Sequence, residues 1–491
     1  GQNNTFIDSS TNNFTITRNG NTTQGSFSPY GNLWSNYFDG ATGTGLSIAN
    51  NAAFAFGAGD FTIECWFNSG GNTSGFFQIC GSEWYGPNNT GKWILLVNNA
   101  VAGDIELMCI GNPGGDNVVV SGTTNVMNGQ WHHIAVSRSG TTVRAFLDGA
   151  IVGTGTSGTS FGMPNSTSLY IGQYYNPGDG SHLYCKGYLS NLRIVKGTAV
   201  YTSAFTPSTT PLTAITNTSL LTCQSNRFID NSANNFALTV SGTTSVQRYS
   251  PFNPTSAYST SVIGGSGYFD GSGDYLIASS ATTSLTGNFT IEMWWYPTVS
   301  ASGYCLFTGA ATYSAQYYFG LYGTNFLINL DGTEASLGTW SNVANTWYHL
   351  ALVRSGSTIT LYVNGVVSGT ANKSNAWVFS GGTDIGGYGS GSFPMKAGYL
   401  SDYRSLNGTA LYTSNFTPPT APLTAITNTS LLCNMTNGAI YDSSMMNDLE
   451  TVGNAQISTS VKKYGTGSMY FGGAGDYLTT PASNALQLNN G

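Results

Sequence analysis

The stretch PLTAITNTSLL occupies Pro211–Leu221 and returns unchanged at Pro422–Leu432. It contains no charged residue, no histidine and no motif with an obvious chemistry. An identical repeat of this length does not arise by chance, so the chain around it is expected to be duplicated as well. The duplication decides how the rest of the sequence is interpreted.

Matching motifs extend outward from this stretch over nearly the whole chain. They form these pairs: FIDSSTNNF at Phe6 with FIDNSANNF at Phe228, YFDG at Tyr37 and at Tyr268, WHHIAVSRSGTTVRAFLDG at Trp131 with WYHLALVRSGSTITLYVNG at Trp347, and GYLSNLR at Gly187 with GYLSDYR at Gly398. A third copy starts near SLLCNMTNGAIYDSS and reaches YFGGAGDYL at Tyr470. The repeating unit is therefore roughly two hundred residues long, the size of one large domain.

Proline marks the junction between units. We interpret PLTAI as the end of one unit and TNTSLL as the linker and first strand of the next. The sequence then predicts one domain at residues 1–214 that lacks its leading strand, a second at residues 215–427, and the first part of a third at residues 428–491. On this interpretation the chain is a window from a longer tandem array.

The hydrophobic pattern of each unit alternates with a period of two and shows no sustained helical period. In TTVRAFLDG the inward side chains are expected to be Val143, Ala145 and Leu147, and the run ends at Asp148-Gly149, a pair that takes the positive φ of a tight hairpin. FTIECWF, which begins at Phe61, is apolar on both faces and is typical of a central strand. The pattern predicts an all-β fold of tandem antiparallel β-sandwich domains of the jelly-roll type.

The motifs occur in the order DSS or DNS followed by NN, then YFDG, FTIE-x-W, W-x-H, RSG, LDG or VNG, and GYLS. This order resembles the concanavalin A-like, laminin G-like jelly-roll domains that occur in tandem in phage tail and fibre proteins and in secreted bacterial adhesins. The resemblance covers both full units and the third fragment. It implies the fold, and it does not specify a ligand.

Charged residues make up only 8% of the chain, against roughly 25% in typical soluble domains. The formal net charge of -7 is spread thinly and without a basic cluster, which argues against a nucleic acid partner. No apolar run approaches the roughly 18–20 residues of a membrane span, so no membrane insertion is expected. A neutral polar surface suits an extracellular or virion protein, although halotolerance or compositional bias would produce the same surface.

An enzyme on this scaffold would be a glycosidase, which needs two carboxyl groups on either side of the scissile bond. The closely spaced acids of related glycosidases are missing, because Glu64 and Glu292 each stand alone in FTIE. We expect them to be partly buried and bonded to a neighbouring strand, at His133 and His349. No nucleophile motif G-x-S-x-G occurs in a strand-to-helix setting. The sequence therefore predicts no catalytic residues and no enzymatic activity.

Calcium is the one cofactor that the sequence suggests, since some relatives in the resembled family bind it through loop oxygens. The candidate ligands are Asp39, Asp270 and Asp274, but the three copies retain these acids unevenly. The alternative is a β-turn in which Asp39 and Asp270 accept backbone hydrogen bonds.

Carbohydrate binding requires exposed aromatic faces together with neutral polar groups. The candidates lie in stretches that do not repeat: Trp84 and Tyr85, Tyr174 and Tyr175, and Tyr317 and Tyr318. The alternative is that these rings pack on sheet edges. A further open question concerns Cys223 and Cys433, which both follow SLL and would pair only if the fold brings them together.

We therefore expect a non-enzymatic structural and adhesive protein of a phage tail fibre or similar virion appendage. Its partners would be cell-surface glycans and other copies or other structural proteins of the same appendage. One alternative is a bacterial extracellular filament or secreted adhesin. The other is a non-catalytic part of a secreted polysaccharide-active enzyme.

Overall fold

The computed structural model separates into two compact units. The first jelly roll comprises Asn32–Pro254, and the second jelly roll comprises Gly1–Gly31 together with Thr255–Pro481. The structure describes the chain apart from residues 1–5, 21, 26, 28–29, 73–74, 76, 84–90, 98–102, 113–114, 123–124, 165–167, 177–180, 249–250, 252–258, 260, 279–283, 301–302, 309–317, 331, 341–342, 378–382, 388–393, 437–449, 453–455, 459–467, 474 and 480–491.

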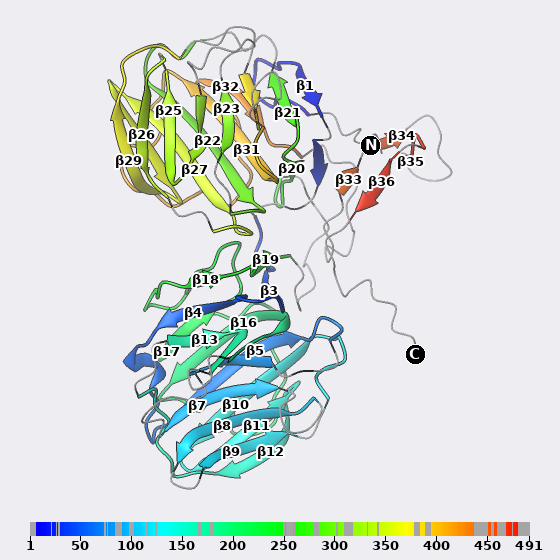
Figure 1. The fold of residues 1–491 in the computed structure, drawn as a ribbon, viewed down its shortest axis with the longest axis vertical. Helices are drawn as coiled ribbons and strands as arrows, with labels where there is room; N and C mark the ends of the chain where they lie inside the picture. The colour runs from blue at the N-terminus through cyan, green and yellow to red at the C-terminus, as the bar shows by residue number, and fades with distance from the viewer. Residues whose placement is uncertain are drawn as a thin grey trace. The chain divides into compact units, whose positions relative to one another are not determined.

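Each unit consists of two antiparallel sheets (Figure 1). One sheet of the first jelly roll has the order β12 (Ala150–Thr156), β11 (Thr142–Leu147), β10 (His132–Ser139), β5 (Phe61–Asn68), β16 (Lys186–Lys196), β3 (Ser35–Asp39) and β19 (Ser245–Gln247), with β17 (Thr218–Thr222) paired to β16. Its other sheet has the order β18 (Thr239–Ser241), β4 (Gly45–Ala49), β13 (Ser168–Ile171), β6 (Phe77–Gly81), β7 (Lys92–Val97), β8 (Ile105–Asn112) and β9 (Gly115–Gly122). A separate hairpin pairs β14 (Gln173–Asn176) with β15 (Ser181–Tyr184).

The second jelly roll repeats this plan. One sheet has the order β29 (Val366–Asn372), β28 (Thr358–Val363), β27 (Tyr348–Ser355), β22 (Phe289–Pro297), β31 (Gly398–Asn407), β20 (Ser266–Phe269) and β2 (Thr23–Gly25), with β32 (Thr429–Cys433) paired to β31. The other has the order β1 (Ile16–Asn19), β21 (Tyr275–Ala278), β30 (Thr383–Ile385), β23 (Tyr304–Thr308), β24 (Tyr318–Tyr322), β25 (Asn325–Asn329) and β26 (Glu334–Thr339). From the third copy, β33 (Glu450–Val452) pairs with β36 (Tyr477–Thr479), and β34 (Gln456–Ser458) pairs with β35 (Ser468–Tyr470).

The prediction of an all-β fold is confirmed. Apart from one 3-10 turn, η1 (Ala52–Phe54), regular structure in the described part of the chain is strand. Val143 and Ala145 are fully buried in the core between the two sheets, as the alternation predicts. Phe146, on the other face of β11, is also buried, because its ring packs against Phe205 from the segment that follows β16. Both faces of this sheet are therefore covered, which explains why FTIECWF is apolar on both sides.

The hairpin turn predicted at Asp148-Gly149 is also confirmed, and the second copy has the matching turn at Asn364-Gly365. Asp148 and Gly149 have φ of 48° and 83°, and the matching Asn364 and Gly365 have φ of 52° and 79°. These positive values give the tight turn whose twist matches the flanking strands.

Gly149 is the turn residue whose replacement we expect to be costly. A Cβ atom there would lie against the Phe205 carbonyl oxygen, far inside contact distance, and φ is already positive. Because a positive φ alone costs about 1–2 kcal/mol for a residue with a side chain, we expect Gly149→Ala to lower the free energy of unfolding of the first jelly roll by about 2–3 kcal/mol. Gly140→Ala is the matched control in urea unfolding, since Gly140 has φ of 59° but nothing within 4 Å of its Cβ position. Equal losses in the two variants would contradict the role of the Phe205 carbonyl.

The boundaries predicted after residues 214 and 427 differ from the units of the structure. Strands β17, β18 and β19 come from the predicted second domain, yet they pair with β16, β4 and β3 of the first jelly roll. Strands β1 and β2 come from the predicted first domain, yet they pair with β21 and β20 of the second jelly roll, and Figure 1 shows blue β1 beside green β21. The physical reason is that near-identical segments fit either unit, so a repeat pattern cannot say which strands a segment will join.

Cys223 and Cys433 are both buried free cysteines, so they do not pair with each other.

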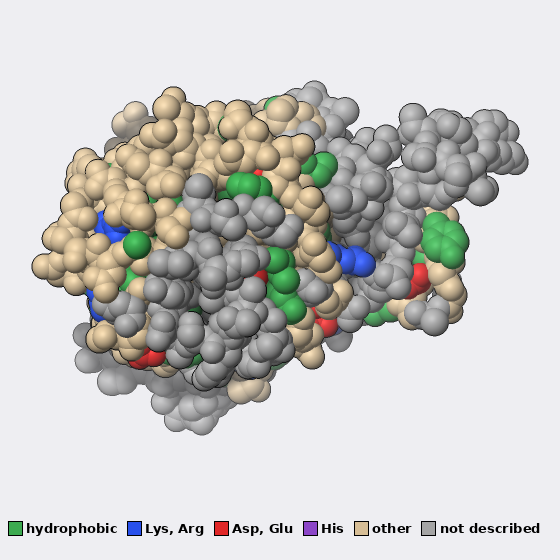
Figure 2. All heavy atoms as spheres, turned by 90° about the horizontal axis from the view of Figure 1, so that it is seen from above, with side chains coloured by type: hydrophobic (Ala, Val, Ile, Leu, Met, Phe, Trp, Pro, Cys, Tyr) green, Lys and Arg blue, Asp and Glu red, His purple; other side chains and the backbone are tan. Residues whose placement is uncertain are grey.

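The surface agrees with the composition. On the face drawn in Figure 2, uncharged side chains and backbone cover most of the described area, and charged groups are sparse. Among the residues that the structure describes, none belongs to a helix long and apolar enough to cross a lipid bilayer.

Candidate functional site

Glu64, on β5, is a fully buried carboxylate of the first jelly roll. Its Oε1 atom accepts hydrogen bonds from Arg193 Nε at 2.9 Å and from Arg193 Nη2 at 2.6 Å. Its Oε2 atom accepts a bond from the Tyr201 hydroxyl at 2.8 Å and lies 3.2 Å from His133 Nε2. These partners come from β16, β10 and the segment after β16, so one side chain joins three parts of the unit.

The same cluster occurs in the second jelly roll. Glu292 Oε1 accepts bonds from Arg404 Nε at 2.9 Å and Nη2 at 2.5 Å. Glu292 Oε2 accepts a bond from the Tyr412 hydroxyl at 2.8 Å and lies 3.2 Å from His349 Nε2. The expectation that each FTIE glutamate is bonded to a histidine of the neighbouring strand is therefore confirmed.

These two carboxylates are structural. Both Glu64 and Glu292 side chains are 0% exposed. Burial by itself raises the pKa of Glu64, but the hydrogen bond from His133 and the charge of Arg193 outweigh it and hold the pKa below its usual value. A buried, fully bonded carboxylate has no path to a substrate and no open position for a glycosidic oxygen.

The candidate calcium ligands are engaged within the protein. Asp39 Oδ1 accepts the backbone N–H of Ala41 and the hydroxyl of Thr44, both at 2.8 Å, and Asp39 Oδ2 accepts the hydroxyl of Thr243. Burial opposes ionisation of Asp39, but these hydrogen bonds lower its pKa below the usual value.

The other two candidates lie together in one turn. Asp270 Oδ1 accepts the N–H of Ser272 at 2.7 Å, and Asp274 Oδ2 accepts the N–H of Asp270 at 2.8 Å. Both Asp39 and Asp270 thus accept a backbone N–H two residues further on, as the β-turn interpretation predicts. Among the described residues no group of three or more His, Cys, Asp or Glu is placed to hold a metal ion. Calcium binding at these acids stays a prediction.

Four of the six aromatic side chains predicted to stack on sugars lie outside the described part of the structure. Trp84, Tyr85 and Tyr317 lie outside the described residues, and so does the side chain of Tyr175. Tyr174 is 7% exposed, so most of its side chain packs within the protein, and its contact with a sugar stays a prediction. Tyr318, on β24, is half-buried, and its hydroxyl donates a hydrogen bond to Glu334.

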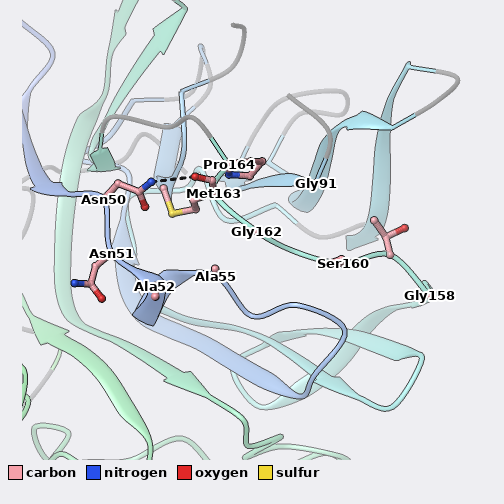
Figure 3. A pocket seen from close by; sticks show the side chains of 11 residues that line it. Asn50, Asn51, Ala52, Ala55, Gly91, Gly158, Ser160, Gly162, Met163 and Pro164 are labelled. Atoms are coloured by element: carbon pink, nitrogen blue, oxygen red, sulfur yellow. Dashed lines mark hydrogen bonds between the residues drawn. The ribbon is translucent and has the colours of Figure 1, made fainter. Parts of the chain in front are cut away.

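An open cleft of about 860 Å³ lies on the first jelly roll, between η1 and the segment at residues 158–164 (Figure 3). Its lining residues are uncharged: Asn50, Asn51, Ala52, Ala55, Gly91, Gly158, Thr159, Ser160, Gly162, Met163 and Pro164. Main-chain groups and neutral side chains therefore supply its hydrogen-bonding capacity.

Hydrogen bonds fix the walls of this cleft. Asn50 Nδ2 donates to the Met163 carbonyl oxygen at 3.0 Å, which joins the end of β4 to the opposite wall, as the dashed line in Figure 3 marks. The Gly162 N–H donates to the Gly91 carbonyl oxygen at 2.6 Å. Asn51 caps η1 by accepting the Ala53 N–H at 2.9 Å. The cleft is thus largely pre-formed, as ligand sites usually are.

The Asn50 and Asn51 pair in this lining is not repeated in the sequence of the second copy. Leu46 and Leu276 pair with Ile171 and Ile385 at matching positions of the two units. Counted along the sequence from these leucines, Ser280 and Ala281, which lie outside the described residues, stand where the first copy has the Asn50 and Asn51 pair. Sequence reasoning missed the cleft because it searched for aromatic pairs. The available signal was an Asn-Asn pair that directly follows a repeated strand and does not itself repeat.

Comparison with known proteins identifies the family of the repeated unit. A sequence model described as the concanavalin A-like lectin/glucanases superfamily matches residues 39–202 and 270–411, well over half of the chain. No curated protein matches the chain.

Three solved structures illustrate the similarity. Domains LG4-5 of the mouse laminin alpha1 chain are 14% identical, with 79% of this chain and 94% of that chain covered and a TM-score of 0.28. Ruminococcus gnavus IT-sialidase CBM40 bound to alpha2,3 sialyllactose is 11% identical, with 35% and 95% covered and a TM-score of 0.28. Domain 4 of an extracellular arabinanase from Geobacillus stearothermophilus is 16% identical, with 31% and 77% covered and a TM-score of 0.24. Because these TM-scores are low, no conclusion about a ligand follows from them.

Proposed function

Because this chain belongs to the concanavalin A-like lectin/glucanases superfamily, we propose that it is a non-enzymatic protein that binds carbohydrate through its first jelly roll. The observation that carries the proposal is the neutral polar cleft beside η1. Sugars present many hydroxyl groups and no charge in their common forms. Amide side chains, Ser and Thr hydroxyls and backbone carbonyls are the groups that match them.

The chemistry of the cleft favours binding over hydrolysis. A glycosidase needs two carboxyl groups about 5–10 Å apart at the substrate. The described lining offers no carboxyl group, and the FTIE glutamates are held inside ion-pair clusters. The lining also has no aromatic ring among its described residues. We therefore expect modest affinity at a single site.

A bulky side chain at Ser160 tests this function. Ser160 is exposed and lines the cleft, so Ser160→Trp is expected to fill it and to weaken glycan binding at least tenfold, about 1.4 kcal/mol. The wild-type chain is first screened on a glycan array, and the best glycan is then titrated calorimetrically into the wild type and the variant.

Ala376→Trp provides the matched control. Residues 161 and 377 form equivalent isolated bridges, so Ala376 stands in the second jelly roll where Ser160 stands in the first. The control should bind like the wild type. A wild-type chain that binds no glycan on the array, or a Ser160→Trp variant that binds as tightly as the control, would remove the proposed function.

The finer part of the proposal concerns where the protein acts. The tandem units, the sparse charge and the family support an extracellular or virion role, in which the first jelly rolls of several chains on one appendage would combine weak sites into useful avidity. Fractionation separates the candidates: the protein should copurify with virions if it belongs to a tail fibre, and with cells or shed filaments if it is a bacterial adhesin.

A further inference from the structure

Each jelly roll is completed by a strand segment from a different copy of the repeat. In the first jelly roll, β18 and β19 come from residues 228–247 and pair with β4 and β3. In the second, β1 and β2 come from residues 6–25 and occupy the equivalent edges of β21 and β20. In the third copy, β33 and β34 instead pair with β36 and β35 of their own copy. The third copy therefore pairs its own strands at these two sheet edges, whereas each jelly roll receives the strands from another copy of the repeat.

The two exchanged segments make identical contacts. Asp230 accepts hydrogen bonds from the N–H and hydroxyl of Ser232, from the Phe236 N–H and from the Leu221 N–H, the last at 3.0 Å. Asp8 accepts the corresponding bonds from Ser10, Phe14 and Leu432, the last also at 3.0 Å. Asp230 and Leu221 are 9 residues apart in the chain, whereas Asp8 and Leu432 are 424 apart. The jelly roll that receives the segment therefore recognises the residues of the segment and not its position in the chain.

A second candidate for the same place exists in this chain. YDSS at Tyr441 sets Asp442 after Leu432 at nearly the spacing that separates Asp230 from Leu221. Tyr441 and Asp442 lie outside the described residues. In the structure, the Leu432 N–H is bonded by Asp8.

Aromatic side chains of the segment at residues 6–30 are buried in the second jelly roll. Phe6 is 3% exposed and belongs to the core of the second jelly roll, and Tyr30 is 1% exposed. The Phe27 ring lies 5.2 Å from that of Trp347 and 5.0 Å from that of Tyr399. Burial of these rings gives the contact a large apolar component. These contacts are all made within one unit, which includes Gly1–Gly31, and the other unit begins at Asn32.

We propose that residues 6–30 are an exchangeable donor segment, and that their partner is the second jelly roll of another copy of this chain. Strand addition to an open sheet edge gives main-chain hydrogen bonds as well as side-chain pockets. Exchange of an identical element between copies is a low-cost route to assembly, because the contacts are the same within one molecule and between two. Donation within one chain is favoured only by its effective concentration, of the order of mM for a short flexible connection. At high local concentration, copies join head to tail.

Engineered disulfides test the proposal on the full chain. Thr17 on β1 and Ile277 on β21 are cross-strand partners, at a spacing that a disulfide can bridge. One chain carries Thr17→Cys, and a second chain of distinguishable mass carries Ile277→Cys. The two are mixed in mild urea, refolded together over a range of protein concentrations and oxidised. We expect a disulfide-linked heterodimer whose fraction rises with concentration.

Two controls define what overturns the proposal. The double variant Thr17→Cys, Ile277→Cys in one chain should form the intramolecular disulfide, which verifies the register. Mixing Thr17→Cys with Val366→Cys reports random collisions, because Val366 is exposed on β29, at the opposite end of its sheet from β2. A double variant that closes while the Thr17→Cys and Ile277→Cys mixture gives no more heterodimer than the Val366 mixture would show that the segment does not exchange. A double variant that does not close would show that the segment is not held on β21, and it would also overturn the proposal.

Discussion

The variant Glu64→Leu is expected to lower the free energy of unfolding of the first jelly roll by about 3–5 kcal/mol, the cost of breaking a buried ion pair. The Arg193 side chain is only 7% exposed and would keep its charge without its counter-ion. The Tyr201 hydroxyl would lose its acceptor at the same time. An uncompensated buried charge and unmet hydrogen-bonding groups act in the same direction.

The repeat supplies an internal control for this measurement. Glu292→Leu removes the same cluster from the second jelly roll, where Arg404 takes the place of Arg193. Calorimetry should therefore show that each variant lowers the unfolding temperature of a different transition. Glu334→Gln alters an exposed carboxylate and should leave both transitions near the wild type.

A second substitution separates loss of charge pairing from loss of packing. In the variant Glu64→Leu, Arg193→Met, no buried charge is left unpaired, so much of the lost stability should return. If the double variant is as unstable as Glu64→Leu alone, the charge of Arg193 is not the source of the effect. If Glu64→Leu itself costs less than about 1 kcal/mol, the cluster does not stabilise the fold as argued.

The sequence contained enough to predict the fold and the fate of the FTIE glutamates. Both follow from local pattern: alternation defines the strands, and a lone acid between apolar neighbours on a central strand must find partners on adjacent strands. The turns at Asp148-Gly149 and Asn364-Gly365 are equally local.

The pairing of the repeated segments could not be predicted. FIDSSTNNF and FIDNSANNF carry the same aspartate and the same pattern, so either fits the site beside Leu221 or beside Leu432. Only three-dimensional pairing distinguishes them. The cleft was missed for a different reason. Its walls are formed by η1 and the segment at residues 158–164, which lie far apart in the chain and contain no residue type that signals binding by itself.

One pair of equivalent residues shows how a single charge distinguishes two nearly identical units. The motif GYLSNLR places Asn191 where GYLSDYR places Asp402, and both residues are buried with positive φ. Asn191 Oδ1 accepts the Leu212 N–H at 2.7 Å. Asp402 keeps the equivalent backbone hydrogen bond, from Leu423. It also faces the Tyr30 hydroxyl and the Asn434 amide, both of which donate to its carboxyl oxygens.

Burial raises the pKa of Asp402 to about 7, and the charge of Glu292 adds to the rise, although the bonds from Tyr30 and Asn434 oppose it. In the unfolded chain the pKa is near 3.8. Below about pH 4 the carboxyl group is protonated in both the folded and the unfolded state, so it does not change the free energy of unfolding. Between pH 4 and 7 the unfolded state ionises first, so stability falls as pH rises, and above pH 7 the loss is constant.

Asp402→Asn is therefore expected to stabilise the second jelly roll by about 2–4 kcal/mol at pH 7.5 and to have little effect at pH 4. The asparagine oxygen can still accept from Asn434, and its amide can donate to the Tyr30 oxygen, so both contacts remain but the direction of the Tyr30 bond is reversed. Urea unfolding at intervals from pH 4 to 8 measures the difference. A gain that is the same at pH 4 and pH 7.5 would contradict a titrating carboxyl group as its cause.

Asn191→Asp is the reciprocal test in the first jelly roll. It places a carboxyl group where the Asn191 amide now donates to the Ser190 hydroxyl oxygen at 2.8 Å. The new carboxylate would lose that donor and meet an oxygen that already donates its proton to the Trp34 carbonyl. The first jelly roll should then become less stable as pH rises through the same interval, while the second is unchanged. Loss of the pH dependence in Asp402→Asn together with its gain in Asn191→Asp would trace the effect to the buried charge, because both residues are buried with positive φ at equivalent positions.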